Sequence, residues 1–127
     1  MLDPTIKALA QAKNFATLTT LSPTGQPETS VMWVGADDEH VLINTETHRR
    51  KFANVSRDPR VSVAIWDLEN PYHYAEVRGR VTATVTGDEA RRHLDSLSQK
   101  YHGTPYPNPI ASERVILRIT PDRQLVR

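Results

Sequence analysis

Apolar and polar residues alternate along several short stretches of the chain, and the longest of these runs from Tyr72 to Thr86. Within it Ala75, Val77 and Val81 point to one side, and mainly charged and hydroxyl-bearing residues point to the other. This period of two predicts a strand with one buried face. Gly79 inside the stretch indicates a bulge or bend. Alternation predicts five further strands, at residues 15–21, 27–34, 41–45, 60–67 and 113–120.

Helical spacing predicts three helices, at residues 3–13, 47–57 and 88–101. In the middle helix we expect Phe52 and Val55 to face inward, and Asn54 and Arg57 to face outward. The stretch from Gly103 to Pro109 contains three prolines and is expected to form a stiff, irregular loop.

The first three predicted strands are joined by short turns, which predicts an antiparallel meander. Six strands with helices inserted between them, and no regular strand–helix repeat, favour a barrel over a doubly wound sheet. The expected fold is therefore mainly β, a six-stranded antiparallel barrel with short flanking helices. No linker or internal repeat divides the chain, so residues 1–127 are expected to form one domain.

Composition excludes several kinds of chemistry. The chain has no cysteine, so it holds no disulfide and no catalytic thiol. A net charge of +1 argues against a nucleic-acid partner. No apolar run is long enough to span a membrane, and the amphipathic N-terminal segment does not resemble a signal peptide, so we expect a cytoplasmic protein. The five histidines are dispersed, which argues against a metal site.

The most informative segment is the junction between the third strand and the helix that follows it. Three consecutive cations, Arg49, Arg50 and Lys51, fall at the expected helix start. Cations are disfavoured at this positive end of the helix dipole unless an anion binds there. Arginine and lysine both bind phosphate, so the pattern predicts a phosphate site. The alternative interpretation is a solvated basic helix face.

Two further clusters each allow two interpretations. Met32 and Trp33 lie on a predicted strand, where they could line a flat ring or simply pack in the barrel. Tyr72, His73 and Tyr74 follow a turn, with the two tyrosines expected on the same side of a strand. They could form a partner surface or a cofactor lid, or a cap at the barrel end.

These segments, in this order, resemble a known family. FATLTTLSPTGQPETSVMWV at residues 15–34, the pattern of Arg49, Lys51 and Asn54, RDPRVSV at residues 57–63 and EVRGRVTATV at residues 76–85 carry the resemblance. The sequence is similar to the split-barrel flavin and deazaflavin oxidoreductases of the pyridoxamine 5′-phosphate oxidase superfamily. Within that superfamily it looks most like the actinobacterial branch that uses the deazaflavin coenzyme F-420.

The resemblance implies a six-stranded split barrel that forms a homodimer, with two cofactor sites across the subunit interface. It implies phosphate-binding cations, a strand beside the ring system, and an aromatic pair that reaches the cofactor of the other subunit. By position, the cofactor-binding residues would be Ser30, Val31, Met32, Thr45, Thr47, Arg49, Arg50, Lys51, Asn54, Tyr72 and Tyr74. No catalytic residue is assigned, since a proton could come from His73, Tyr72 or solvent.

The expected function is that of an F-420-dependent oxidoreductase. Reduced deazaflavin donates a hydride, here to an electron-poor double bond of a small organic substrate, and the cofactor carries the difficult chemistry. One alternative keeps the fold with FMN as cofactor, giving an oxidase or flavin reductase. A second alternative is a non-catalytic protein that binds F-420 or FMN.

Overall fold

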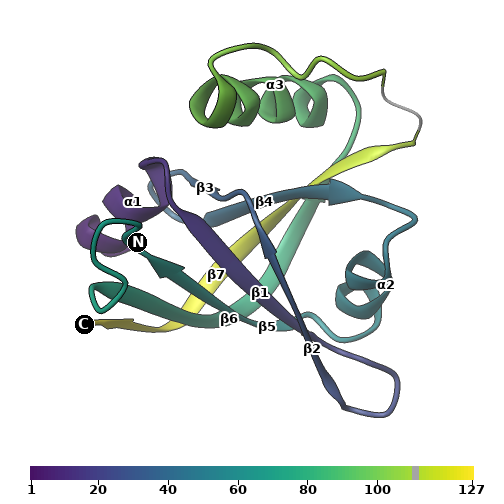
Figure 1. The fold of residues 1–127 in the computed structure, drawn as a ribbon. Helices are drawn as coiled ribbons and strands as arrows, with labels where there is room; N and C mark the ends of the chain where they lie inside the picture. The colour runs from purple at the N-terminus through teal and green to yellow at the C-terminus, as the bar shows by residue number, and fades with distance from the viewer. Residues whose placement is uncertain (110–111) are drawn as a thin grey trace.

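The computed structural model describes residues 1–109 and 112–127, and the predicted loop at residues 103–109 is irregular there. The helices are α1 (Pro4–Gln11), α2 (Arg50–Arg57) and α3 (Asp88–His102). The strands are β1 (Phe15–Leu21), β2 (Pro27–Met32), β3 (Gly35–Ala36), β4 (Val41–Glu46), β5 (Arg60–Trp66), β6 (Tyr74–Val85) and β7 (Arg114–Val126). Figure 1 shows these elements as a strongly curled sheet with the helices at its margins.

The strands form one antiparallel sheet in the order β2-β1-β5-β6-β7-β4-β3. Two residues, Trp33 and Val34, separate β2 from β3, although these strands lie at opposite edges of the sheet. The chain therefore crosses the gap between the edges at this point, which gives a split barrel. The predicted mainly β antiparallel split barrel is confirmed.

Two details of the predicted topology are wrong. β2 pairs with β1 but not with β4, so the first strands do not form a simple meander. Gly35 and Ala36, predicted as part of a turn, pair with Leu42 and Val41 as a seventh strand. The reason is that β2 ends at Met32, and the chain then moves to the other edge of the sheet before it turns back.

The longest pairing joins β6 to β7, and it is irregular. Its register shifts between Arg78 and Gly79, which confirms the predicted irregularity at this glycine. A side chain at Gly79 would collide with the carbonyl oxygen of Thr120 across the pair. β6 starts at Tyr74 rather than at Tyr72, and β7 continues past the predicted end at Thr120 to Val126.

The core lies inside the curled sheet and follows the predicted alternation. Its largest fully buried side chains on the strands are Leu18, Val41, Ile43, Val63, Ile65, Val77, Val115, Leu117 and Ile119. Helix α1 begins with Asp3 as its N-cap, whose carboxylate accepts from the backbone N–H groups of Thr5 and Ile6. Its buried face, with Ile6 and Leu9, joins the same core.

Helix α3 is fastened to the barrel through Tyr101. The indole of Trp33 stacks on the Tyr101 ring at a centroid distance of 5.0 Å, and Phe15 lies 5.5 Å from the same ring. The Tyr101 hydroxyl donates to the carbonyl of Asn14 and accepts from the N–H of Val34. Trp33, in the crossing from β2 to β3, thus packs against α3. This contact agrees with the interpretation that Trp33 packs in the barrel.

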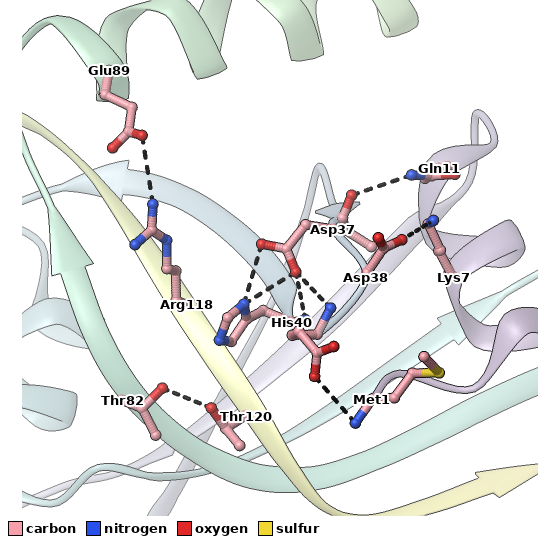
Figure 2. Close-up of polar contacts among 12 residues, drawn as sticks. Met1, Lys7, Gln11, Asp37, Asp38, His40, Thr82, Glu89, Arg118 and Thr120 are labelled. Carbon is pink, nitrogen blue, oxygen red and sulfur yellow. Dashed lines mark hydrogen bonds and ion pairs between the residues drawn. The ribbon is translucent and has the colours of Figure 1, made fainter.

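Polar contacts hold the helices against the sheet (Figure 2). Lys7 of α1 pairs with Asp38, next to the bond between the His40 ring and Asp37. Glu89 of α3 pairs with Arg118 of β7 at 3.5 Å. Among the described residues, no helix combines the length and the apolar character needed to cross a membrane.

Candidate functional site

The junction between β4 and α2 forms the centre of the site. The helix starts later than predicted, at Arg50, with Arg49 in extended conformation as its N-cap. No side chain caps this end, and its first turn contains no acidic residue. The N–H of Phe52 bonds the carbonyl of Arg49 at 3.1 Å, which leaves the N–H groups of Arg50 and Lys51 ahead of the first bonded turn. This helix end is therefore electropositive and suited to an anion.

A hollow of about 350 Å³ lies between this helix end and the strands β1 and β2. We call it the α2 hollow; it is lined by Thr20, Glu28, Thr29, Ser30, Arg49, Arg50, Lys51 and Asn54. Five of these residues were predicted to bind the cofactor, namely Ser30, Arg49, Arg50, Lys51 and Asn54. The fold thus brings the three cations together with residues 28–30 of β2, although the two segments are about twenty residues apart in the sequence.

Asn54 does not face outward as predicted, because its side chain is only 2% exposed. Its amide Nδ2 donates to Thr20 Oγ1 at 2.9 Å and to Glu28 Oε1 at 2.8 Å. A buried amide needs such partners, and both lie on the strands beneath α2. Asn54 therefore ties the helix to β1 and β2 at the floor of the hollow.

Glu28 was not among the predicted site residues, yet it is the carboxylate of the hollow. Its Oε1 accepts from Arg50 Nε at 2.8 Å as well as from Asn54. The hydrogen bond from Asn54, followed by that from Arg50, holds the pKa of the Glu28 carboxyl below its ordinary value. The period of two along β2, which places Glu28, Ser30 and Met32 on one face, is the sequence signal that could have found it.

Arg49 is also paired with a carboxylate. Its Nη2 lies 3.0 Å from Glu46 Oε1, and the same oxygen lies 3.4 Å from Arg114 Nη1. The pKa of Glu46 is lowered, chiefly by a hydrogen bond from Ser112 and then by Arg49. Glu46 thus fixes one of the three consecutive cations at the edge of the hollow.

Lys51 is the cation of the hollow that forms no ion pair among the described residues. Partial burial lowers the pKa of its ammonium group, and the neighbouring charge of Arg49 lowers it further, while the charge of Glu46 offsets part of this. The first two causes disfavour the charged ammonium, and an anion in the hollow would relieve them. Lys51 is therefore the uncommitted cation of the site.

The donors of the hollow fit a phosphate group. Lysine and arginine, hydroxyl groups of Thr29 and Ser30, and N–H groups at a helix start are the usual phosphate ligands in proteins. Coenzyme F-420 and FMN both carry a phosphate on a ribityl chain, so each offers a group of this class. Among the described residues, no group of three histidine or acidic side chains could hold a metal ion.

The other six predicted site residues do not line the hollow. Thr45 is buried on the inner face of β4, and the N–H of Thr47 bonds the carbonyl of Glu113. Met32 is half-buried against the core, whereas Val31 on the opposite face of β2 is 63% exposed. Their roles as cofactor ligands remain predictions.

Tyr72 and Tyr74 lie apart from the hollow of their own chain. Tyr72 is in the turn before β6 and is 88% exposed, and Tyr74 is the first residue of that strand. The expectation that both tyrosines point to one side of the same strand is therefore wrong, because the strand starts two residues later. His73 between them contacts the C-terminal Arg127, with its Nδ1 2.7 Å from the Arg127 carbonyl oxygen.

Comparison with known proteins places this chain in a family. The sequence profile of the pyridoxamine 5′-phosphate oxidase family matches residues 2–125. Because the match covers nearly the whole chain, the protein belongs to this family, and the resemblance seen in the sequence is confirmed. No curated protein sequence matches the chain at a significant level.

Several solved structures are similar over almost the whole chain. A protein described as an F-420 reductase shares 29% identity at a TM-score of 0.84, with 98% of each chain covered. A conserved hypothetical protein of Mycobacterium tuberculosis shares 27% sequence identity at a TM-score of 0.77, with 98% of this chain and 82% of that chain covered. General Stress Protein 26 of Bacillus anthracis shares 18% identity at a TM-score of 0.71, with 96% of this chain and 90% of that chain covered, and this similarity shows the fold alone. Together with the family, the similarity to the protein described as an F-420 reductase supports an oxidoreductase of the flavin-binding type.

Proposed function

We propose that the protein is an oxidoreductase that binds coenzyme F-420 and reduces an electron-poor double bond of a small organic substrate. The observation that carries the proposal is the α2 hollow, where Lys51 is an uncommitted cation beside a helix start. The similarity to a protein described as an F-420 reductase, over 98% of both chains, supports the choice of cofactor.

The residues of the hollow would bind and orient the cofactor. Lys51 would neutralise the phosphate, and the N–H groups at the start of α2 would fix its position. Arg50 is held by Glu28, so its guanidinium is already oriented before any ligand arrives. When bound, reduced F-420 supplies a hydride from carbon 5 of its ring. The protein contributes binding, orientation and charge, which explains why the sequence contains no recognisable catalytic triad.

A homodimer with a cofactor site at each subunit interface would account for the three exposed residues among those predicted outside the hollow. Val31, Tyr72 and Tyr74 are exposed in the single chain, and exposed apolar side chains of this size favour a partner surface. Tyr72 and His73 lie outside the hollow of their own chain, so in the proposed dimer they would serve the second cofactor site.

An anaerobic single-turnover experiment tests the reaction. Purified protein is mixed with reduced F-420 and one member of a panel of cyclic enones, and deazaflavin absorbance is followed. Reoxidation that requires both protein and enone supports the reductase. Tight F-420 binding without reoxidation across the panel would instead favour the non-catalytic binding protein.

The same protein preparation tests the cofactor. FMN and F-420 differ in absorption and fluorescence, so the spectrum of the purified protein identifies any bound cofactor. FMN bound after purification, together with NAD(P)H-driven flavin reduction or oxygen consumption, would move the protein to the FMN-dependent oxidases or flavin reductases.

A further inference from the structure

The α2 hollow suits an anion, yet it already contains a negative charge. Glu28 Oε1 accepts from Arg50 Nε and from Asn54 Nδ2, both at 2.8 Å. An exposed carboxylate would normally turn away from an incoming anion. Here Asn54 is buried and is itself held by Thr20, so the carboxylate is fixed at the floor of the hollow.

Glu28 lowers the positive charge that the hollow offers a ligand. The lining contains three cations, Arg49, Arg50 and Lys51, and one carboxylate, Glu28. At the side of the hollow, one further carboxylate, Glu46, is shared by Arg49 and Arg114. The lining therefore has a net charge of about two positive units, one fewer than it would have without Glu28.

We propose that Glu28 shifts the preference of the α2 hollow towards a phosphodiester, with one negative charge, and away from a phosphomonoester, which carries nearly two. The proposal rests on the assignment of the hollow to the phosphate of the cofactor, and it deepens that assignment. F-420 carries a phosphodiester, because its phosphate joins the ribityl chain to the lactyl group. FMN ends in a phosphomonoester, whose charge near pH 7 is about −1.5 to −2.

The physical basis is repulsion at short range. The Glu28 carboxylate repels each negative charge of a bound ester, so a monoester, with nearly two charges, is disfavoured more than a diester, with one. Removing the Glu28 charge should therefore favour the monoester over the diester, by about fivefold or more. Glu28 thus acts as a specificity residue through its charge, in addition to orienting Arg50.

The test compares two ligands with the same ring and different phosphate charge. FMN and riboflavin 4′,5′-cyclic phosphate share the isoalloxazine, and the cyclic ester has a single charge. Dissociation constants are measured by flavin fluorescence for the wild type and for Glu28→Gln. Glutamine keeps an oxygen that accepts from Asn54, so the substitution removes charge with little change of shape. Glu69→Gln, in the exposed β5–β6 loop, is the matched control for charge removal.

We expect Glu28→Gln to improve FMN affinity by about fivefold or more relative to the cyclic ester, with no such change in Glu69→Gln. An equal change for both esters, or a loss confined to FMN, would overturn the inference. Glu28→Ala, with its melting temperature measured beside the wild type, separates a charge effect from a folding defect, since it too removes the charge.

Riboflavin itself distinguishes this inference from the proposed function. If neither ester binds more tightly than riboflavin, the hollow is not the phosphate site, and both proposals fail. If both esters gain affinity from their phosphate but Glu28→Gln changes them equally, only the selectivity inference fails.

Discussion

At the scale of single residues, Lys51 is the side chain on which cofactor binding depends most. Replacing it by alanine removes the uncommitted cation from the α2 hollow but no ion pair among the described residues. We expect Lys51→Ala to weaken F-420 binding by about 1.5–3 kcal/mol, the usual contribution of a hydrogen bond to a charged group. Fluorescence titration measures this loss.

Lys13 provides the control for that experiment. It is an exposed lysine near the end of α1, on the border of a different cavity. Lys13→Ala should bind F-420 as the wild type does. Unchanged affinity in Lys51→Ala would remove the phosphate assignment, and equal losses in both variants would point to a general charge effect.

His93 is the residue whose burial should appear in the pH dependence of stability. Burial, followed by the charge of Lys100, lowers its pKa to about 4. Its Nδ1 accepts from the Asn44 amide at 3.0 Å, and the Asn44 oxygen accepts from Arg114, so the neutral ring has its proton on Nε2. Between about pH 6.5 and pH 4, this histidine is protonated in the unfolded chain but remains neutral in the folded chain.

The free energy of unfolding should therefore fall as the pH drops from about 6.5 towards 4, and should not change through this group above pH 7. We expect His93 to account for about 2 kcal/mol of the loss between pH 7 and pH 4.5. Urea denaturation of the wild type and of His93→Gln at both pH values measures this. Equal pH dependence in the two proteins would show that His93 titrates normally.

Residue-level prediction located side chains where local charge was the signal and failed where tertiary pairing decided. Local charge at a helix start indicated Arg49, Arg50 and Lys51, and all three line the α2 hollow, although their role as phosphate ligands remains a prediction. Helical spacing placed Asn54 on the outer face, since the spacing cannot reveal Thr20 and Glu28 beneath it. The period of two along β2 places Glu28 beside Ser30, but its pairing with Arg50 and Asn54 has no local signal, because these partners come from another segment.

At the scale of the secondary-structure elements, the β6–β7 pair depends on close approach at Gly79. A Cβ there would collide with backbone of Thr120, and a strand pair cannot move apart locally without losing hydrogen bonds. We expect Gly79→Ala to lower the free energy of unfolding by at least about 2 kcal/mol, as is usual for strain forced on a packed backbone. Chemical denaturation measures it.

Gly35 in β3 is the matched control. A Cβ at Gly35 would lie 3.5 Å from His93 Nε2 and from a methyl group of Leu97, which are ordinary contacts. Gly35→Ala should therefore change stability by less than about 1 kcal/mol. Comparable destabilisation by both substitutions would contradict the account of the β6–β7 bulge.

The positions of the helices and strands along the chain were largely predictable, whereas the pairing of the strands in the sheet was not. Alternation located the long strands because each has one buried face, as the pattern of β5 illustrates. β3 has only two residues, too few to show a period. Which edge of the sheet it joins is decided by the crossing at Trp33 and by the packing of Tyr101 on that indole, neither of which has a local signal.

At the scale of the whole molecule, we expect a homodimer. Sedimentation equilibrium should give twice the 14.3 kDa mass of the chain. Because the proposed cofactor sites lie across the interface, Tyr72→Ser should weaken F-420 binding although Tyr72 lies outside the hollow of its own chain. A monomer that binds F-420 with full affinity would show that one chain holds a complete site.

The most direct test of the account is a titration of the purified protein with F-420 and, separately, with FMN, followed by fluorescence quenching. The account predicts micromolar or tighter binding of F-420, much weaker binding of FMN, and a loss of F-420 affinity in Lys51→Ala. Preference for FMN would contradict the assignment of the cofactor. Binding of neither ligand would show that the basic start of α2 serves another anion, and the proposed oxidoreductase function would fall with it.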